Sequence, residues 1–138
     1  MSVNRGRHHL MVLPEDDANR ELANGFHLGC GAIRQLQVLP PAGGWTKVVD
    51  SFTTVHVREL KRNPLRFLAL LIDFDGDPNR RRLVTEKIPP HLTERVFLLG
   101  NFHHPERLRQ SLAMPLEAIG EQAAQDCPDG CRWRLAPR

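Results

Sequence analysis

The sequence contains no tyrosine and no long apolar run, and each of these two gaps excludes a class of protein. Without tyrosine, no mechanism in which a tyrosine of this chain attacks its substrate is open. The longest clear apolar run, Phe67–Ile72, has the length of a strand and falls far short of the roughly 20 residues that span a bilayer. The first seven residues carry positive charge with no apolar stretch behind it, so we expect neither a signal peptide nor a membrane partner.

Cysteine is also sparse, with Cys30, Cys127 and Cys131 making an odd number. Together with the expected lack of a signal peptide, this favours a reduced, cytoplasmic location. Cys127 and Cys131 flank a Pro-Asp-Gly loop that could supply two zinc ligands. No second pair completes such a site, because Cys30, His103 and His104 are scattered, so structural zinc is the less favoured interpretation.

The balance of the remaining residues is that of an ordinary globular domain. Hydrophobic residues make up 41% and charged residues 25% of the sequence. Its length of 138 residues is enough for one domain and too short for two. We expect a single domain with its core at about residues 8–125 and a tail at 126–138. The formal net charge of +3 comes with sixteen arginines and three lysines. Arginine suits phosphate, but GC-rich coding also enriches it, so the charge is compatible with a polyanion without identifying one.

Strand-like and helix-like segments alternate along the chain. Strands are predicted at 8–13, 34–39, 66–72 and 95–99, and helices at 17–27, 46–62, 79–87 and 105–125, the last broken or kinked at Pro115. In the second helix, the expected apolar face consists of Val48, Val49, Phe52, Val55 and Leu60. This alternation predicts a compact, Rossmann-like α/β fold with a four-stranded, mainly parallel sheet flanked by helices, in the common strand order 2-1-3-4.

The two densest acidic clusters follow the first and third predicted strands. Glu15-Asp16-Asp17 follows one, and Asp73, Asp75 and Asp77 follow the other. In the order 2-1-3-4 these strands are neighbours, and ligands bind beyond the carboxyl ends of such strands. Carboxylates brought together repel unless a cation offsets them, and hard oxygen ligands favour Mg²⁺ or Mn²⁺ and phosphoryl chemistry. The alternative is that these acids only cap helices and form turns.

The arrangement resembles the TOPRIM domain of topoisomerases, primases, small ribonucleases and nucleases of the overcoming-lysogenization-defect class. The family motif is a glutamate after the first strand and an Asp-x-Asp pair after the third, which Glu15 and Asp73-Phe74-Asp75 match. Gly43-Gly44 resembles a glycine turn of the nuclease-type members, and Glu106 is a looser match to an acidic position after the fourth strand. The resemblance covers roughly residues 8 to 110 and implies a TOPRIM fold.

The resemblance also implies an activity. Asp73 and Asp75 would hold Mg²⁺ (or Mn²⁺), Glu15 would be a general acid or base or a further metal ligand, and Asp77 an outer ligand. Topoisomerases need a tyrosine and primases need further domains. A metal-dependent nuclease acting on DNA or RNA remains, or a nuclease-like subunit in a complex with an ATPase partner, by analogy in anti-phage defence. A homo-oligomer is a further option.

Basic side chains near the same edge are candidates for nucleic-acid contact. Arg80, Arg81 and Arg82 follow the second acidic cluster, and Lys47 follows the glycine turn. The alternative is a solvated helix face. His103 and His104 follow the fourth strand and are interpreted as a surface pair or as proton-transfer groups.

Two other functions compete with the nuclease. A response-regulator receiver would use the acids after the first strand to hold Mg²⁺ and Asp73 to accept phosphate. A receiver also has a fifth strand that ends in a lysine and a Met-Pro step in the turn after the acceptor, whereas here no lysine follows Lys87 and the turn after Asp73 has no Met-Pro step. An inactive interaction module would use the fold only to dock a partner. The complete set of Glu15, Asp73 and Asp75 favours the nuclease over both.

Overall fold

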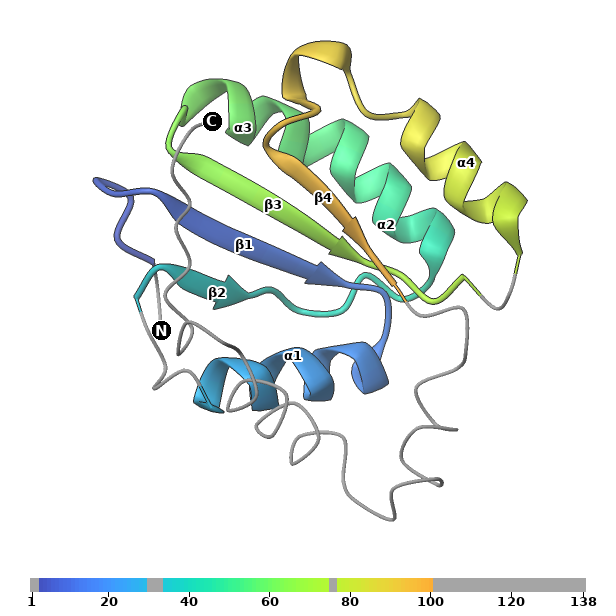
Figure 1. Cartoon of the computed structure of the whole chain (residues 1–138), viewed down its shortest axis with the longest axis horizontal. Helices are drawn as coiled ribbons and strands as arrows, with labels where there is room; N and C mark the ends of the chain where they lie inside the picture. Colours follow the sequence, from blue (N-terminus) through green and yellow to red (C-terminus); the bar gives the residue numbers. More distant parts are fainter. Residues whose placement is uncertain (1–2, 30–33, 75–76, 101–138) are drawn as a thin grey trace.

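The computed structural model describes residues 3–29, 34–74 and 77–100, and shows one four-stranded parallel sheet flanked by helices (Figure 1). The strands are β1 (His9–Pro14), β2 (Leu36–Val38), β3 (Arg66–Leu71) and β4 (Val96–Leu99), in the order β2-β1-β3-β4. The helices are α1 (Asp17–Gly29), α2 (Trp45–Ser51), α3 (Val57–Arg62) and α4 (Pro78–Glu86), with a π-helical segment η1 (Phe52–His56) and a 3-10 turn η2 (Pro90–Leu92). The predicted α/β class, parallel pairing and strand order are confirmed.

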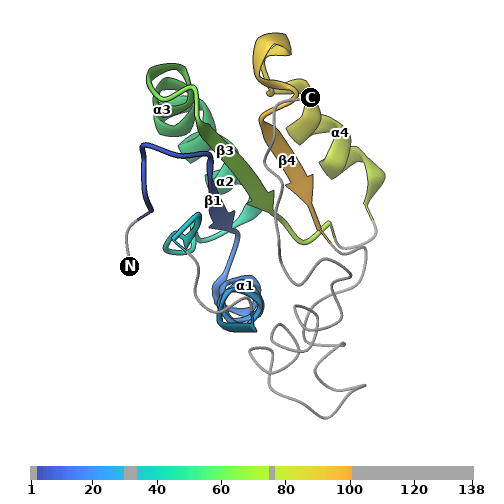
Figure 2. The same ribbon diagram turned by 60° about the vertical axis from the view of Figure 1, so that its left-hand side comes forward.

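The helices divide between the two faces of the sheet. Figure 2 shows α1 on one face and α2, α3 and α4 on the other. The larger core lies under the second group and joins Leu68 and Leu70 of β3 to Val48, Leu60 and Val84 of the helices. The smaller core, on the α1 face, is formed by Leu10, Val12, Leu36, Phe67 and Ala69, with Ala23 of α1 packed against it. As predicted, β3 is a central strand, buried along almost its whole length.

The helix predicted over residues 46–62 is not a regular α-helix, because η1 interrupts it between α2 and α3. A π-turn holds one residue more than an α-turn, so it rotates everything after it. Phe52 is therefore followed on the buried side by Val57 and Leu60, while Val55 is 49% exposed. The prediction that Val55 belongs to the apolar face is wrong for this reason.

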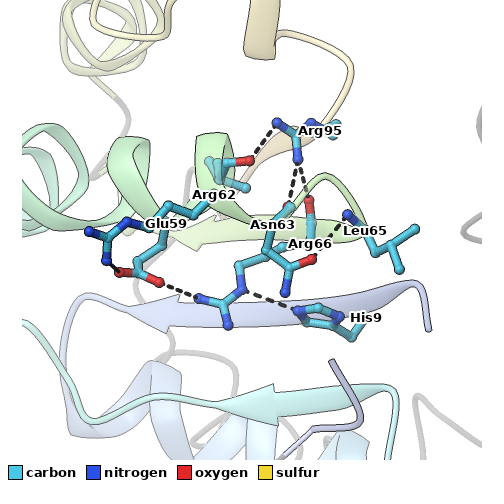
Figure 3. A network of polar contacts seen from close by, with 8 residues as sticks. His9, Glu59, Arg62, Asn63, Leu65, Arg66 and Arg95 are labelled. Atoms are coloured by element: carbon cyan, nitrogen blue, oxygen red, sulfur yellow. Dashed lines mark hydrogen bonds and ion pairs between the residues drawn. The ribbon is translucent and has the colours of Figure 1, made fainter. Parts of the chain in front are cut away.

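A buried polar network lies at the amino ends of the neighbouring strands β1 and β3 (Figure 3). Arg66 and His9, both buried, are paired across the two strands. Arg66 Nε donates to His9 Nε2 at 3.1 Å, and His9 Nδ1 lies 2.8 Å from the Arg7 carbonyl oxygen. Nε2 must accept from Arg66, so the proton of the neutral ring sits on Nδ1. Glu59 lies 3.8 Å from the Arg66 guanidinium and partly balances its charge.

Arg95, just before β4, ties the same edge together through backbone carbonyls. Its guanidinium donates to the carbonyl oxygens of Leu60, Asn63 and Arg66 at 2.8, 3.1 and 3.2 Å. The end of α3 and the start of β3 are thus held by one cation. These contacts stabilise the amino ends of the strands. Ligands of parallel sheets bind at the opposite, carboxyl ends.

No helix among residues 3–29, 34–74 and 77–100 is long and apolar enough to cross a membrane. The helix predicted at 105–125, the histidines at 103 and 104, Glu106 and all three cysteines lie outside the described residues.

Candidate functional site

The carboxyl ends of β1 and β3 bring Glu15 and Asp73 together. The register pairs Pro14 with Leu71, and the N–H of Glu15 donates to the Leu71 carbonyl at 2.9 Å, which extends the pairing past the end of β1. The Glu15 carboxylate oxygen Oε2 then accepts a hydrogen bond from the backbone N–H of Asp73 at 2.6 Å. Asp73 is only 4% exposed. The predicted meeting of the two acidic clusters at one edge is therefore observed for these two residues.

A tight glycine turn fixes the backbone of Glu15. The N–H groups of Gly43 and Gly44 donate to the Glu15 carbonyl oxygen at 2.8 and 3.1 Å, and the N–H of Ala42 donates to Pro14 at 2.9 Å. The two glycines have φ values of 97° and 144°, which L side chains rarely adopt. Only glycine therefore fits this turn without strain. It orients Glu15 and starts α2 at the same edge.

Arg80 connects α4 to the same site. One of its terminal nitrogens donates to the Asp73 carbonyl oxygen at 2.8 Å, and its guanidinium carbon lies 5.1 Å from the centre of the Trp45 ring. A guanidinium at this distance over an indole makes a cation–π contact. Trp45 is the first residue of α2, so Arg80 joins the starts of two helices to the backbone of Asp73.

The surroundings of Glu15 shift its protonation. Burial, followed by the nearby charges of Asp16 and Asp73, raises the pKa of Glu15 above its ordinary 4.5, while the hydrogen bond from the Asp73 N–H and the charge of Arg80 act against this rise. The rise therefore reflects mainly the cost of burying a charged carboxylate, with the neighbouring negative charges as a smaller cause. Such a carboxyl is suited to exchange a proton or to meet a cation.

The remaining acids at this edge have local structural roles. Asp16 Oδ1 accepts from the N–H of Asn19 at 2.9 Å, so Asp16 caps the start of α1, in line with the alternative that these acids cap helices. Asp77 is exposed, and its Oδ1 accepts from the N–H of Asn79 at 2.9 Å, capping α4. Asp75 lies outside the described residues. Among the residues that the structure does describe, no three His, Cys, Asp or Glu side chains form a metal-binding group.

The predicted basic residues separate into two kinds. Arg80 is half-buried and held by Asp73 and Trp45, whereas Arg81 and Arg82 are exposed on α4. Lys47 is exposed in the first turn of α2, where its side chain folds back beside Gly43. Trp45 was not predicted to take part. Its place directly after the glycine turn was the only signal in the sequence, and no spacing links it to Arg80.

Comparison with protein-family models, with curated proteins and with solved structures finds no match to this chain.

Proposed function

We propose that the chain is a TOPRIM-like, Mg²⁺- or Mn²⁺-dependent nuclease that hydrolyses phosphodiester bonds of DNA or RNA. The observation that carries the proposal is the 2.6 Å hydrogen bond between the Glu15 carboxylate and the Asp73 backbone. It places the predicted acid or base directly beside the start of the predicted metal-binding pair. This supports the proposal because the resemblance to the TOPRIM family expects the glutamate and the Asp-x-Asp pair to lie at the same ends of neighbouring strands.

The donor set fits a hard divalent cation. Glu15, Asp73 and Asp75 offer carboxylate oxygens, which Mg²⁺ and Mn²⁺ prefer. The raised pKa of Glu15 comes first from burial of its carboxyl group and then from the charges of Asp16 and Asp73, and a cation bound beside it would favour the ionised form. When bound, such an ion supplies Lewis-acid activation of a phosphoryl oxygen.

Residues of the chain supply proton exchange, the positioning of Asp73 and contacts with the substrate. Glu15, held by the glycine turn, exchanges the proton of the attacking water or of the leaving oxygen. Arg80 holds the Asp73 backbone through its hydrogen bond and its contact with Trp45. The exposed Arg81, Arg82 and Lys47, at the starts of α4 and α2, contact the phosphate backbone of the substrate.

The nuclease-type resemblance further suggests an assembly. We propose that the chain works in a complex with an ATPase partner in the cytoplasm, by analogy in anti-phage defence. Of the residues predicted to bind nucleic acid, only Lys47, Arg81 and Arg82 are exposed. Three basic side chains form a small surface for binding a polyanion without a partner protein.

The test is a cleavage assay with plasmid DNA and with single-stranded RNA, in Mg²⁺ or Mn²⁺, with the product of the neighbouring gene present. Glu15→Gln should lower the rate by at least about a hundredfold, the usual range for losing an acid–base group. Asp73→Asn should also lower the rate, because it removes a carboxylate that would hold the metal ion. Asp17→Asn is the matched control, because Asp17 is an exposed acid at the same edge that pairs only loosely with Arg20, at 3.9 Å. Undiminished cleavage by Glu15→Gln would refute the assignment.

Incubation with acetyl phosphate separates the nuclease from the receiver. A stable, acid-labile phosphate on Asp73, absent from Asp73→Asn, would identify a receiver and overturn the nuclease. Absence of both cleavage and phosphorylation in the complex would indicate an interaction module.

A further inference from the structure

The α1 face of the sheet is only half covered by the part of the chain that the structure describes. Helix α1 packs over the β1 and β2 side of this face, through Ala23. The register sets Phe97 opposite Ala69 and Leu99 opposite Leu71, so both β4 residues belong to this same face. They are 40% and 49% exposed. The helices α2, α3 and α4 lie on the other face and do not cover them (Figure 2).

The exposed Phe97 and Leu99, the partly buried Leu71 and the buried Phe67 lie next to one another on this face, and we call this apolar group the open strip. The rings of Phe67 and Phe97 stack with centroids 6.2 Å apart and planes 15° from parallel. Leu71 is only partly buried and packs against the smaller core. Parallel strands of α/β proteins are normally covered on both faces, so the open strip needs a partner.

The sequence that follows β4 contains a matching apolar stripe. The chain runs on for 38 residues after Gly100. Within residues 105–125, apolar residues recur at helical spacing on one side, and polar residues occupy the opposite side. The apolar stripe consists of Leu108, Leu112, Leu116, Ile119 and Ala123, and the opposite side of Gln110, Glu117 and Glu121.

We propose that segment 105–125 packs as a helix on the open strip, beside α1, and completes the second face of the sheet. The segment leaves from the carboxyl end of β4, the strand that carries Phe97 and Leu99. Gly100 marks the departure, because a Cβ there would lie 2.1 Å from the Ile72 carbonyl oxygen, so the chain passes tightly over the end of β3. Pro115 breaks or kinks this helix, and the ten residues on either side of it each reach about 15 Å as a helix, which is enough to cross a strand of four residues.

A segment of the same chain is favoured over a second copy. Covalent attachment gives the segment an effective concentration in the millimolar range, whereas a second copy must associate at its free concentration. Val84 of α4 belongs to the larger core on the other face, so among the described residues the exposed side chains of β4 lie on the α1 face.

Amide hydrogen exchange on the full-length chain tests the proposal. Backbone amides of residues 105–125 should exchange at least tenfold more slowly than in an unstructured peptide. Phe97→Asp should remove most of that protection. The matched control is Leu83→Asp, since Leu83 is 43% exposed on α4, which packs on the other face; it should leave the protection unchanged. Exchange of the segment at unstructured rates in the wild-type chain overturns the proposal.

A double-mutant cycle and the oligomeric state complete the test. The destabilisation caused by Leu99→Ser and by Leu116→Ser, measured by urea unfolding, should be less than additive, whereas Leu99→Ser with Glu117→Ser should be additive. Sedimentation should show the same mass for the wild-type chain and for Phe97→Asp. A wild-type dimer that Phe97→Asp dissociates would identify a second copy as the occupant and contradict the proposal.

Discussion

The carboxylate of Glu15 accepts a hydrogen bond from the backbone N–H of Asp73 at 2.6 Å, although the two residues are 58 positions apart in the sequence. The contact joins the carboxyl ends of two adjacent parallel strands. It leaves a carboxyl group half-buried beside Asp16 and Asp73, and the pKa of Glu15 is raised by burial first and by these charges next. Ionisable groups whose burial lowers the stability of the fold are common at functional sites.

Replacing Glu15 should therefore stabilise the protein at neutral pH. Because the folded pKa of Glu15 lies above 4.5, the unfolded chain loses this proton first, and folding stability falls as pH rises from about 4.5 through the folded pKa. Glu15→Gln keeps an oxygen that accepts from the Asp73 N–H but does not ionise. In metal-free buffer, its free energy of unfolding should exceed that of the wild type above that window, and the excess should shrink toward pH 4. Urea unfolding across this range checks the prediction, and an excess that does not change with pH contradicts it.

Arg80 should behave as a positioning residue, unlike its neighbour Arg81. Its bond to the Asp73 carbonyl and its contact with Trp45 suggest that Arg80→Ala costs about 2 kcal/mol of unfolding free energy. Arg81→Ala, on the exposed side of α4, should cost less than about 0.5 kcal/mol. In nucleic-acid binding the order should reverse, with Arg81→Ala reducing the salt dependence of binding. Equal stability of the two variants would show that Arg80 does not organise the site.

The buried His9 should make stability depend on pH near neutrality. Burial lowers the pKa of His9 below 6.5, the charge of Arg66 adds to this, and the hydrogen bond to Arg7 opposes it. Burial also lowers the pKa of His56, with the charge of Arg66 again adding to the effect. Below pH 6.5 the unfolded chain therefore binds more protons than the folded one, so stability is complete above 6.5 and is lost as pH falls toward the folded pKa.

The check is urea unfolding of the wild type and of the double variant His9→Gln/His56→Gln between pH 7.5 and 5.5. The gap in unfolding free energy between wild type and double variant should move in favour of the variant as pH falls. A gap that stays constant over this range would mean that neither histidine carries the pH dependence. His9→Gln keeps an oxygen that can accept from Arg66 Nε, so the comparison does not leave that donor stranded.

The fold could be predicted from the sequence to the level of strand order, because the signals are strong and local. The run from Phe67 to Ile72 has no polar interruption and has the length of a strand, which is typical of a parallel strand buried on both faces. Asn63-Pro64 ends a helix by excluding the helical conformation before proline, and α3 does end at Arg62. Alternation of such elements with right-handed crossovers then leaves few topologies.

The π-helical segment could not be predicted, because the spacing of the apolar residues does not distinguish it from a regular α-helix. Residues 46–62 match an α-helical pattern, and the choice between Val55 and Val57 as the buried residue depends on packing against the sheet. Thr53 and Thr54, whose hydroxyls donate to the Asp50 carbonyl oxygen at 3.2 and 2.7 Å, accompany the wider turn. Only the tertiary structure shows that the extra residue is accommodated there.

Of the site, the sequence predicted Glu15, Asp73 and the ends of the strands where they meet, but neither Trp45 nor the contacts between the residues. Glu15 and Asp73 lie together because β1 and β3 are neighbours, which strand order alone implies. That Glu15 meets the backbone of Asp73, and that Arg80 turns inward onto Trp45, depend on side-chain geometry that spacing does not encode. The role of Asp75 as a ligand stays a prediction, since it lies outside the described residues.

Calorimetric titration of the full-length chain with Mn²⁺ tests the central claim most directly, because it needs neither a substrate nor a partner. The account predicts one binding site, weakened at least tenfold by Asp73→Asn and by Asp75→Asn and unchanged by Asp17→Asn, the exposed acid at the same edge. Glu15→Gln should weaken binding less than the Asp substitutions do if it serves as acid or base. Equal Mn²⁺ affinity of the wild type, Asp73→Asn and Asp75→Asn would contradict the assignment of this edge as a metal centre.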